Sequence, residues 1–376
     1  VASWKVLNTY SIPEPVVGGL AVALLLWLLH ATAAIQVGFD KTLGPPLMLA
    51  FFACIGLNAD LPSLLRGGRP LVVLLAVVVG FLVLQNLTGI GLAMLLGQSP
   101  LVGLLAGSIS LSGGHGTGAA WSAVFTERYQ LAGAKEIAIA SATFGLVLGG
   151  VIGGPVARHL LGKVRVKPGA DSAHQEPTLF EHPAEVRLIT APALIETLAL
   201  ISVCLLVGQQ IARALAGTFM ELPAFVCVLF VGVILRNGLA AAGKYTVFER
   251  AVSVLGNVSL ALFLALALMS MRLWELSSLA LPMLVLLLGQ TALMAAYAIF
   301  VTFPVMGRNY DAAVIAAGHC GFGLGATPTA IANMQAVTDR FGNSPLAFLV
   351  VPMVGAFFID LANALVIKLF LMLPLY

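Results

Sequence analysis

Ser108-Ile-Ser-Leu-Ser-Gly-Gly-His-Gly-Thr-Gly118 and Gly318-His-Cys-Gly-Phe-Gly-Leu-Gly-Ala-Thr-Pro-Thr329 are two glycine-rich, polar stretches in a chain that is otherwise almost continuously apolar. Irregular backbone is costly in hydrocarbon, and it is tolerated at membrane depth only where protein buries it or where it lines a wet cavity. One stretch lies in each half of the chain. Together they predict two interrupted membrane segments that meet in a binding site.

The composition predicts an all-α polytopic membrane protein. Of the 376 residues, 60% are hydrophobic and only 9% are charged, and the mean hydropathy is +1.03, far from the usage of soluble proteins. The net charge of +3 is dispersed along the chain, which argues against nucleic acid as a partner. The four cysteines show no metal or redox spacing, so we expect free thiols.

Apolar stretches of membrane length predict nine crossings, at residues 16–36, 45–65, 71–96, 136–161, 191–216, 222–236, 252–271, 279–305 and 346–373. Two further segments, about 101–125 and about 312–337, carry the glycine stretches at mid-length. We predict that each of these two is a re-entrant hairpin.

A polar stretch at 163–187 divides the chain into an N-terminal repeat, 1–162, and a C-terminal repeat, 188–376. Gly113 aligns with Gly325 and Thr117 with Thr329. The second half has a span before its Pro223 that the first half lacks, so a first helix is expected upstream of residue 1. An odd number of crossings separates equivalent spans, so the repeats are expected to be inverted. Most Lys and Arg residues fall on the side of residue 1, which makes that side, and the linker, cytoplasmic.

Inverted halves with broken elements near the midplane are typical of secondary transporters. Helix ends that face a cavity offer N–H groups to a carboxylate and C=O groups to a cation, and glycine lets the backbone approach the ligand. Small residues also suit tight helix packing, and His115 also suits a hydrogen bond within its loop. We predict no catalytic residues, and a substrate site formed by Ser112, Gly113, Gly114, His115, Gly116, Thr117, Gly323, Gly325, Thr327, Thr329, Asn333 and Asp311.

Polar side chains inside the spans predict cation binding, because oxygen ligands suit a hard ion such as sodium. Asp360 is the deepest acid, and Asn363 lies on the same helix face. Amides such as Gln85 and Asn86 also suit hydrogen bonding between helices, and the serines suit bonding to their own helix backbone. The predicted sodium ligands are Ser108, Ser110, Asn58, Asn86, Gln290, Asp360 and Asn363, with no other metal.

Four motifs also carry a resemblance to a known family. They are Leu111-Ser-Gly-Gly-His-Gly-Thr-Gly-Ala-Ala-Trp121, Gly318-His-Cys-Gly-Phe-Gly-Leu-Gly-Ala-Thr-Pro-Thr-Ala-Ile-Ala-Asn-Met-Gln335, Tyr10-Ser-Ile-Pro-Glu-Pro15 and Phe248-Glu-Arg-Ala-Val-Ser-Val-Leu-Gly-Asn-Val-Ser259. With these motifs the chain resembles the bacterial sodium/glutamate symporter family through essentially its whole length. Family members have an additional N-terminal helix, which agrees with the repeat.

The resemblance implies sodium-driven uptake of L-glutamate across the bacterial inner membrane, without a cofactor beyond sodium as the coupling ion. It implies inverted repeats with re-entrant loops, a homodimer in the lipid bilayer, and a scaffold along which a mobile transport unit moves like an elevator. Asp311 or Asp360 would balance the substrate's ammonium group or sodium.

Alternatives to this reading remain. The nearest is a sodium-coupled carrier of another carboxylate, such as citrate or aspartate. A channel would need a continuous polar pathway, whereas the polar residues cluster at mid-depth. An intramembrane hydrolase would need a nucleophile elbow, Gly-x-Ser-x-Gly, and an orienting acid, and neither is evident.

Overall fold

The computed structural model describes residues 14–33, 39, 42–164, 189–218, 222–243, 247–269 and 280–375. Within these ranges every regular element is a helix, which confirms the all-α fold class. The N-terminal residues 1–13 and nearly all of the predicted linker, 163–187, lie outside the described part.

Six described helices are long and apolar enough to cross a membrane, and a seventh span results if α15 and α16, bent by 46°, are counted as one. The chain is therefore a polytopic membrane protein, although the count of nine spans is not reproduced. Outside the two hairpins, the helices are α2 (Glu14–Ala33), α3 (Gly44–Asn58), α4 (Pro62–Leu95), α7 (Ala134–Leu161), α8 (Ala191–Leu215), α9 (Ala224–Ala241), α10 (Glu249–Met269), α11 (Ala280–Tyr297), η3 (Ala298–Thr302), α12 (Phe303–Val305), α15 (Pro345–Met353), η4 (Val354–Phe358) and α16 (Ile359–Leu371).

The predicted span 45–65 is wrong at its C-terminal end, because α3 ends at Asn58 and α4 begins at Pro62. Proline suits the first turn of a helix, where its missing N–H has no partner to lose. The side chain of Asn237, on α9, then satisfies the exposed backbone: its Oδ1 accepts from Leu61 N and its Nδ2 donates to Ala59 O, both at 2.9 Å. These hydrogen bonds from a distant helix therefore stabilise the break between α3 and α4.

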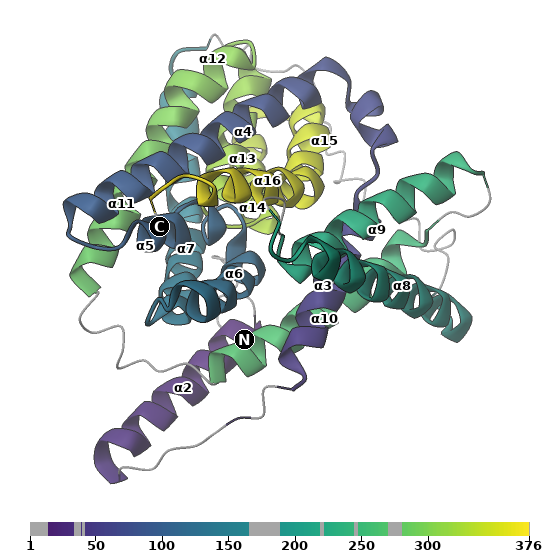
Figure 1. The fold of residues 1–376 in the computed structure, drawn as a ribbon. Helices are drawn as coiled ribbons and strands as arrows, with labels where there is room; N and C mark the ends of the chain where they lie inside the picture. The colour runs from purple at the N-terminus through teal and green to yellow at the C-terminus, as the bar shows by residue number, and fades with distance from the viewer. Residues whose placement is uncertain are drawn as a thin grey trace.

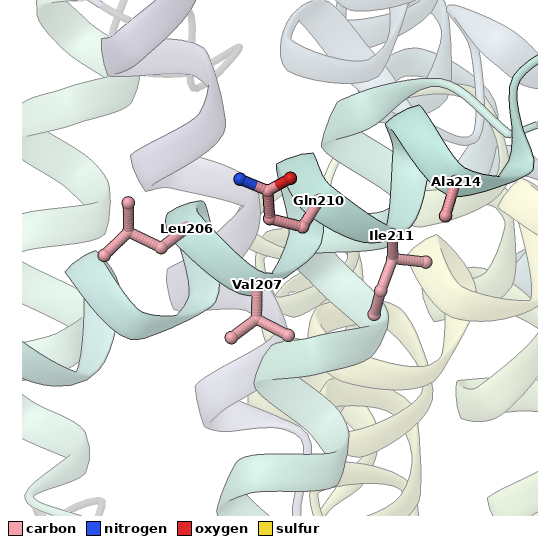
Figure 2. Close-up of a pocket in the computed structure, with 5 residues that line it drawn as sticks. All are labelled: Leu206, Val207, Gln210, Ile211 and Ala214. Carbon is pink, nitrogen blue, oxygen red and sulfur yellow. The ribbon is translucent and has the colours of Figure 1, made fainter.

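Two groups of helices are visible in Figure 1. The peripheral group consists of α2, α3, α8, α9 and α10, and the hairpin group consists of all elements of 62–164 and 280–371. Within the peripheral group, α3 and α9 touch at Gly56, where a Cβ would lie 2.2 Å from Leu229 O. On the outside of this group, α8 carries a largely apolar groove (Figure 2), lined by Leu206, Val207, Gln210, Ile211 and Ala214.

Both predicted hairpins are helix–break–helix elements of the hairpin group. The first consists of α5 (Pro100–Leu104), a π-helical turn η1 (Leu105–Ile109), a non-helical tip at 110–113 and α6 (Gly114–Tyr129). The second consists of α13 (Tyr310–Leu324) and α14 (Thr327–Phe341). Asn333 Nδ2 donates to Ala317 O at 3.2 Å, and a Cβ on Gly321 would lie 2.5 Å from the Cα of Ala330. The arms of the second hairpin are therefore antiparallel and in close contact.

The two groups meet through apolar side chains. Trp121 of α6 packs edge-on against Phe225 of α9, with ring centroids 5.5 Å apart. A Cβ on Gly116 of α6 would lie 2.6 Å from Phe51 Cε1 of α3. The first hairpin thus lies between the second hairpin and the peripheral group.

Candidate functional site

The tips of the two hairpins lie against each other. Gly114, with φ of +68°, begins α6, and a Cβ placed on it would lie 3.7 Å from Gly325 O at the end of α13. The helix α14 then begins at Thr327. Both helices therefore begin at or within two residues of this contact, and their first-turn N–H groups have no partners within their own helices. Such helix ends attract anions.

The glycines of the two stretches have different tasks. Gly114 supplies the left-handed backbone of the tip, which L-residues rarely adopt. Gly113 instead permits close packing, because a Cβ on it would lie 2.5 Å from Ile109 O. Gly116 contacts Phe51, and a Cβ on Gly323 would lie 2.7 Å from Met294 Sδ. Close packing thus accounts for most of these glycines.

Two amide side chains of α4, those of Gln85 and Asn86, form hydrogen bonds with the hairpins. Gln85 Nε2 donates to Gly323 O at 3.1 Å, and Gln85 Oε1 accepts from Ser112 Oγ at 2.7 Å. Asn86 Oδ1 accepts from Ser108 N at 2.9 Å. From α11, Gln290 Nε2 donates to the backbone oxygen of Gln85 at 2.8 Å. Gln85 was not among the site residues predicted from the sequence. The sequence feature that marks it is an amide side chain in the middle of a span, beside Asn86.

Several of the predicted sodium ligands have buried oxygens that find no hydrogen-bond partner within the described residues. They are Ser108 Oγ, Ser110 Oγ, Gln290 Oε1 and Asn363 Oδ1 in the hairpin group, and Asn58 Oδ1 in the peripheral group. Asn363 Nδ2 donates to Ser108 O at 2.9 Å, which places its free oxygen beside the first hairpin. Buried polar atoms are normally paired, so unpaired oxygens in one region suit a cation.

An acid and three threonine hydroxyls lie in the region of the hairpin tips. Thr117, on the first turn of α6, lies near the Asp360 carboxylate at the start of α16. Thr327 lies against η4, the turn that precedes α16. A Cβ placed on Gly355 of η4 would lie 3.2 Å from the Oγ1 of Thr327. The buried Oγ1 of Thr329 lacks a partner among the described residues. The structure therefore brings the threonines of both motifs to the region of the hairpin tips.

His115 and Asn333 make internal hydrogen bonds. Thr143 Oγ1 donates its proton to Ile139 O at 2.8 Å, so it accepts from His115 Nε2 at 3.0 Å. The Nε2 nitrogen therefore carries the proton. Asn333 Nδ2 bonds to Gly149 O on α7 at 2.9 Å as well as to Ala317 O. These two residues fasten the hairpins to α7.

Asp311 and Asn58 are not brought to the tips. Asp311 lies in the first turn of α13, at the far end of the second hairpin, where its Oδ1 accepts from Ser344 Oγ at 2.6 Å. Asn58 is on α3 in the peripheral group, and its Nδ2 donates to Ser253 Oγ at 3.2 Å. The four cysteines are free and buried. Among the described residues, no cluster of His, Cys, Asp and Glu could hold a metal ion.

Comparisons with known proteins agree with the resemblance noted in the sequence. The family model described as sodium/glutamate symporter matches residues 1–343. The chain is 66% identical over 376 residues to the sodium/glutamate symporters of Escherichia coli and Shigella flexneri, covering 100% of this chain and 94% of each relative. It is 56% identical over 366 residues to that of Haemophilus influenzae, covering 97% of this chain and 91% of the relative.

These relatives lend no support to the alternative of a citrate or aspartate carrier. Symporters move solutes across a membrane and are not enzymes, in agreement with the prediction of no catalytic residues. A model match over most of the chain and relatives this similar establish the membership. The chain belongs to the sodium/glutamate symporter family.

Proposed function

We propose that this chain carries L-glutamate into the cell together with sodium, by alternating access at the junction of the two hairpin tips. The observation that carries the proposal is the contact of Gly114 with Gly325, which brings together the N-terminal ends of α6 and α14. Glutamate has two carboxylates, and two helix N-termini offer a separate anion site to each.

Recognition of the carboxylates uses the free N–H groups of the tips and the hydroxyls of Thr117, Thr327 and Thr329. The buried hydroxyl of Thr329 supports this role, because it has no described protein partner to satisfy it. Asp360, close to Thr117, stands where a carboxylate can balance the substrate's ammonium group or a sodium ion. Asp311 cannot take this role from its place at the far end of the second hairpin.

Sodium binds beside the first hairpin, through the hydroxyls of Ser108 and Ser110 and the amide oxygen of Asn363. Each of these atoms is buried and unpaired within the described chain. Sodium is a hard cation that takes several neutral or anionic oxygen ligands, so it would satisfy all three at once.

Helix contacts support the inverted repeat. If α2, α3, α4 and α7 correspond to α9, α10, α11 and α15–α16, a two-fold relation requires contacts in reciprocal pairs. The pair α3–α9 is matched by α2–α10, and α4–α16 is matched by α7–α11. We therefore take the peripheral group as the scaffold and the hairpin group as the mobile, elevator-like unit. A homodimer in the bacterial inner membrane completes the proposal.

Uptake of labelled L-glutamate into proteoliposomes tests this function. Accumulation is expected with an inward sodium gradient and not when potassium replaces sodium, and excess aspartate or citrate should compete poorly. Thr329→Val should raise the glutamate KM, whereas Thr197→Val, whose hydroxyl donates to Ala193 O on α8, should not. Accumulation without sodium, or faster uptake of citrate, would contradict the proposal.

A further inference from the structure

We propose that Gln85 is the positioning residue that couples sodium binding to glutamate binding. The inference rests on the proposed function and adds a residue to it. Gln85 is fully buried at the middle of α4 and bonds the tip of each hairpin with one half of its amide. It connects the sodium-binding hairpin to the tip of the other, beside the direct contact of Ser112 Oγ with Gly323 O.

The orientation of the Gln85 amide follows from its partners. A carbonyl oxygen can only accept a hydrogen bond, so the nitrogen of the amide must face Gly323 O. The oxygen then faces Ser112 and accepts from its hydroxyl. Exchanging the two ends of the amide would break one bond and oppose two oxygens, so the geometry selects a single arrangement.

Ser112 has one hydroxyl proton and two acceptors within reach. Its Oγ lies 2.7 Å from Gln85 Oε1 and 2.9 Å from Gly323 O. The proton can serve only one acceptor fully at a time, so Ser112 can turn between α4 and the second hairpin. With the proton on Gln85, the Gly323 carbonyl keeps its bond from Gln85 Nε2. The three groups therefore form one connected unit.

The sodium ligands are joined directly to this unit along the chain. Ser108 and Ser110 precede Ser112 on the same short segment, and Asn86, the neighbour of Gln85, accepts from Ser108 N. Gln290 holds the Gln85 backbone oxygen, so this part of α4 is a fixed point. An ion that shifts Ser108 and Ser110 must therefore move Ser112 against Gln85, and through it change the position of Gly323.

Binding measurements on the purified, full-length protein test the inference. Glutamate affinity is measured at saturating sodium and with sodium replaced by N-methylglucamine, and sodium affinity with and without glutamate. The ratio of the two glutamate affinities must equal the ratio of the two sodium affinities, because coupling between ligands is reciprocal. Allosteric coupling is typically about 5- to 150-fold. In Gln85→Met, which keeps the length of the side chain without its polar groups, both ratios should fall to within about threefold of unity.

The matched control is Gln210→Met, the same change on the outer face of α8, which should leave the wild-type ratio intact. Ser112→Ala removes the hydroxyl from the unit with little change in volume and should lower the ratio too. In the double variant the two effects should overlap rather than add, because both residues belong to one connected unit. If Gln85 and Ser112 had a purely structural role, their substitution would lower the melting temperature and leave the coupling ratio unchanged.

Wild-type coupling in folded Gln85→Met, or additive effects in the double variant, would overturn the inference while leaving the proposed function intact. If Gln85→Met cannot be purified, Ser112→Ala decides the question by the same ratio. A wild-type protein whose glutamate affinity ignores sodium would overturn the proposed function, and the inference with it.

Discussion

At the scale of single residues, unsatisfied atoms distinguish ligand-binding groups from structural ones. Most serine and threonine hydroxyls on these helices donate to the carbonyl one turn earlier, as Ser141 does to Ile137 O at 2.7 Å. Ser108 and Ser110 are equally buried and have no such bond to a described residue. Leaving a buried hydroxyl unpaired destabilises a protein, so an ion that pairs it is the simplest reason for its presence.

Ser108→Ala and Ser110→Ala should therefore each raise the sodium concentration for half-maximal glutamate uptake, by about tenfold. A hydrogen bond or ligand contact to a charge contributes about 1.5–3 kcal/mol, and about 1.4 kcal/mol is a factor of ten. Sodium titrations of uptake measure the change. The melting temperature should hardly fall, because no described protein bond is lost, and Ser141→Ala should leave the sodium requirement unchanged. A large loss of stability without a shift in sodium dependence would assign these hydroxyls to structure.

Asp311→Asn should destabilise the protein without changing the KM for glutamate. The bond from Ser344 to the Asp311 carboxylate closes the base of the second hairpin, and a charge-assisted bond of this kind contributes about 1.5–3 kcal/mol. Thermal unfolding in detergent and uptake kinetics separate the two effects, and Ser344→Ala should reproduce the loss. A higher glutamate KM at unchanged stability would restore Asp311 to the substrate site.

Residue types alone could predict part of the site and not the rest. Ser108, Ser110 and Asn363 stood out because polar side chains are rare within spans. Asp311 was predicted for the substrate as an acid that could balance its ammonium group or sodium. A helix rises about 1.5 Å per residue, so α13 carries Asp311 roughly 20 Å from the tip.

At the scale of elements, the two hairpins are held differently. In the second, α13 and α14 pack on each other, and side chains tie their open ends together, with Tyr310 and Ser344 as donors. In the first, α5 packs on α4 while α6 packs on α7. The arms of the second hairpin thus pack on each other as well as on α7, whereas the conformation of the first depends on its neighbours and on the bonds from α4.

Gly321→Ala should disrupt the second hairpin. The new Cβ would lie 2.5 Å from the Cα of Ala330, so the arms must separate, and such overpacking costs about 1–3 kcal/mol. Gly154→Ala on α7 adds the same methyl group where nothing lies within 4 Å, and it should be neutral or stabilising. Melting temperature and uptake rate check both variants. If both variants had the same melting temperature and uptake rate, the arms of the second hairpin would not be closely packed in the working protein.

Glycine patterns in an apolar chain predicted where the helices are interrupted, since the breaks at 110–113 and 325–326 fall within the two predicted segments. The break between α3 and α4 was missed because Asn237, far away in the sequence, supplies its hydrogen bonds. The π-helical turns η1, η3 and η4 were missed as well, because a single extra residue in a helix leaves no clear periodic signal.

At the scale of the whole molecule, the hydrogen bonds that build the site all lie within the hairpin group, from Gln85 and Ser112 to His115 and Asn363. Contact with the peripheral group includes the ring pair Trp121–Phe225 and the close approach of Gly116 to Phe51. Apolar contacts of this kind have no directional bonds to break when one surface slides over another. This division suits movement of the hairpin group as one body.

Uptake should be accelerated by an inside-negative potential. Glutamate carries one negative charge, whose entry is opposed by about 2.3 kcal/mol per 100 mV, and a single sodium ion would only cancel this term. With two or more sodium ions per glutamate, 100 mV would raise the limiting accumulation by about 50-fold or more. Vesicles clamped by potassium and valinomycin measure this, and uptake that is equal at 0 and −100 mV would indicate electroneutral transport.

The central claim is that glutamate and sodium bind where the two hairpin tips meet. An experimental structure of the full-length protein in lipid, with saturating sodium and L-glutamate, tests it most directly. The account predicts density for the two carboxylates at the first turns of α6 and α14, and an ion within reach of Ser108, Ser110 and Asn363. Glutamate bound at the groove of α8, or at any site that leaves both tips unoccupied, would contradict it.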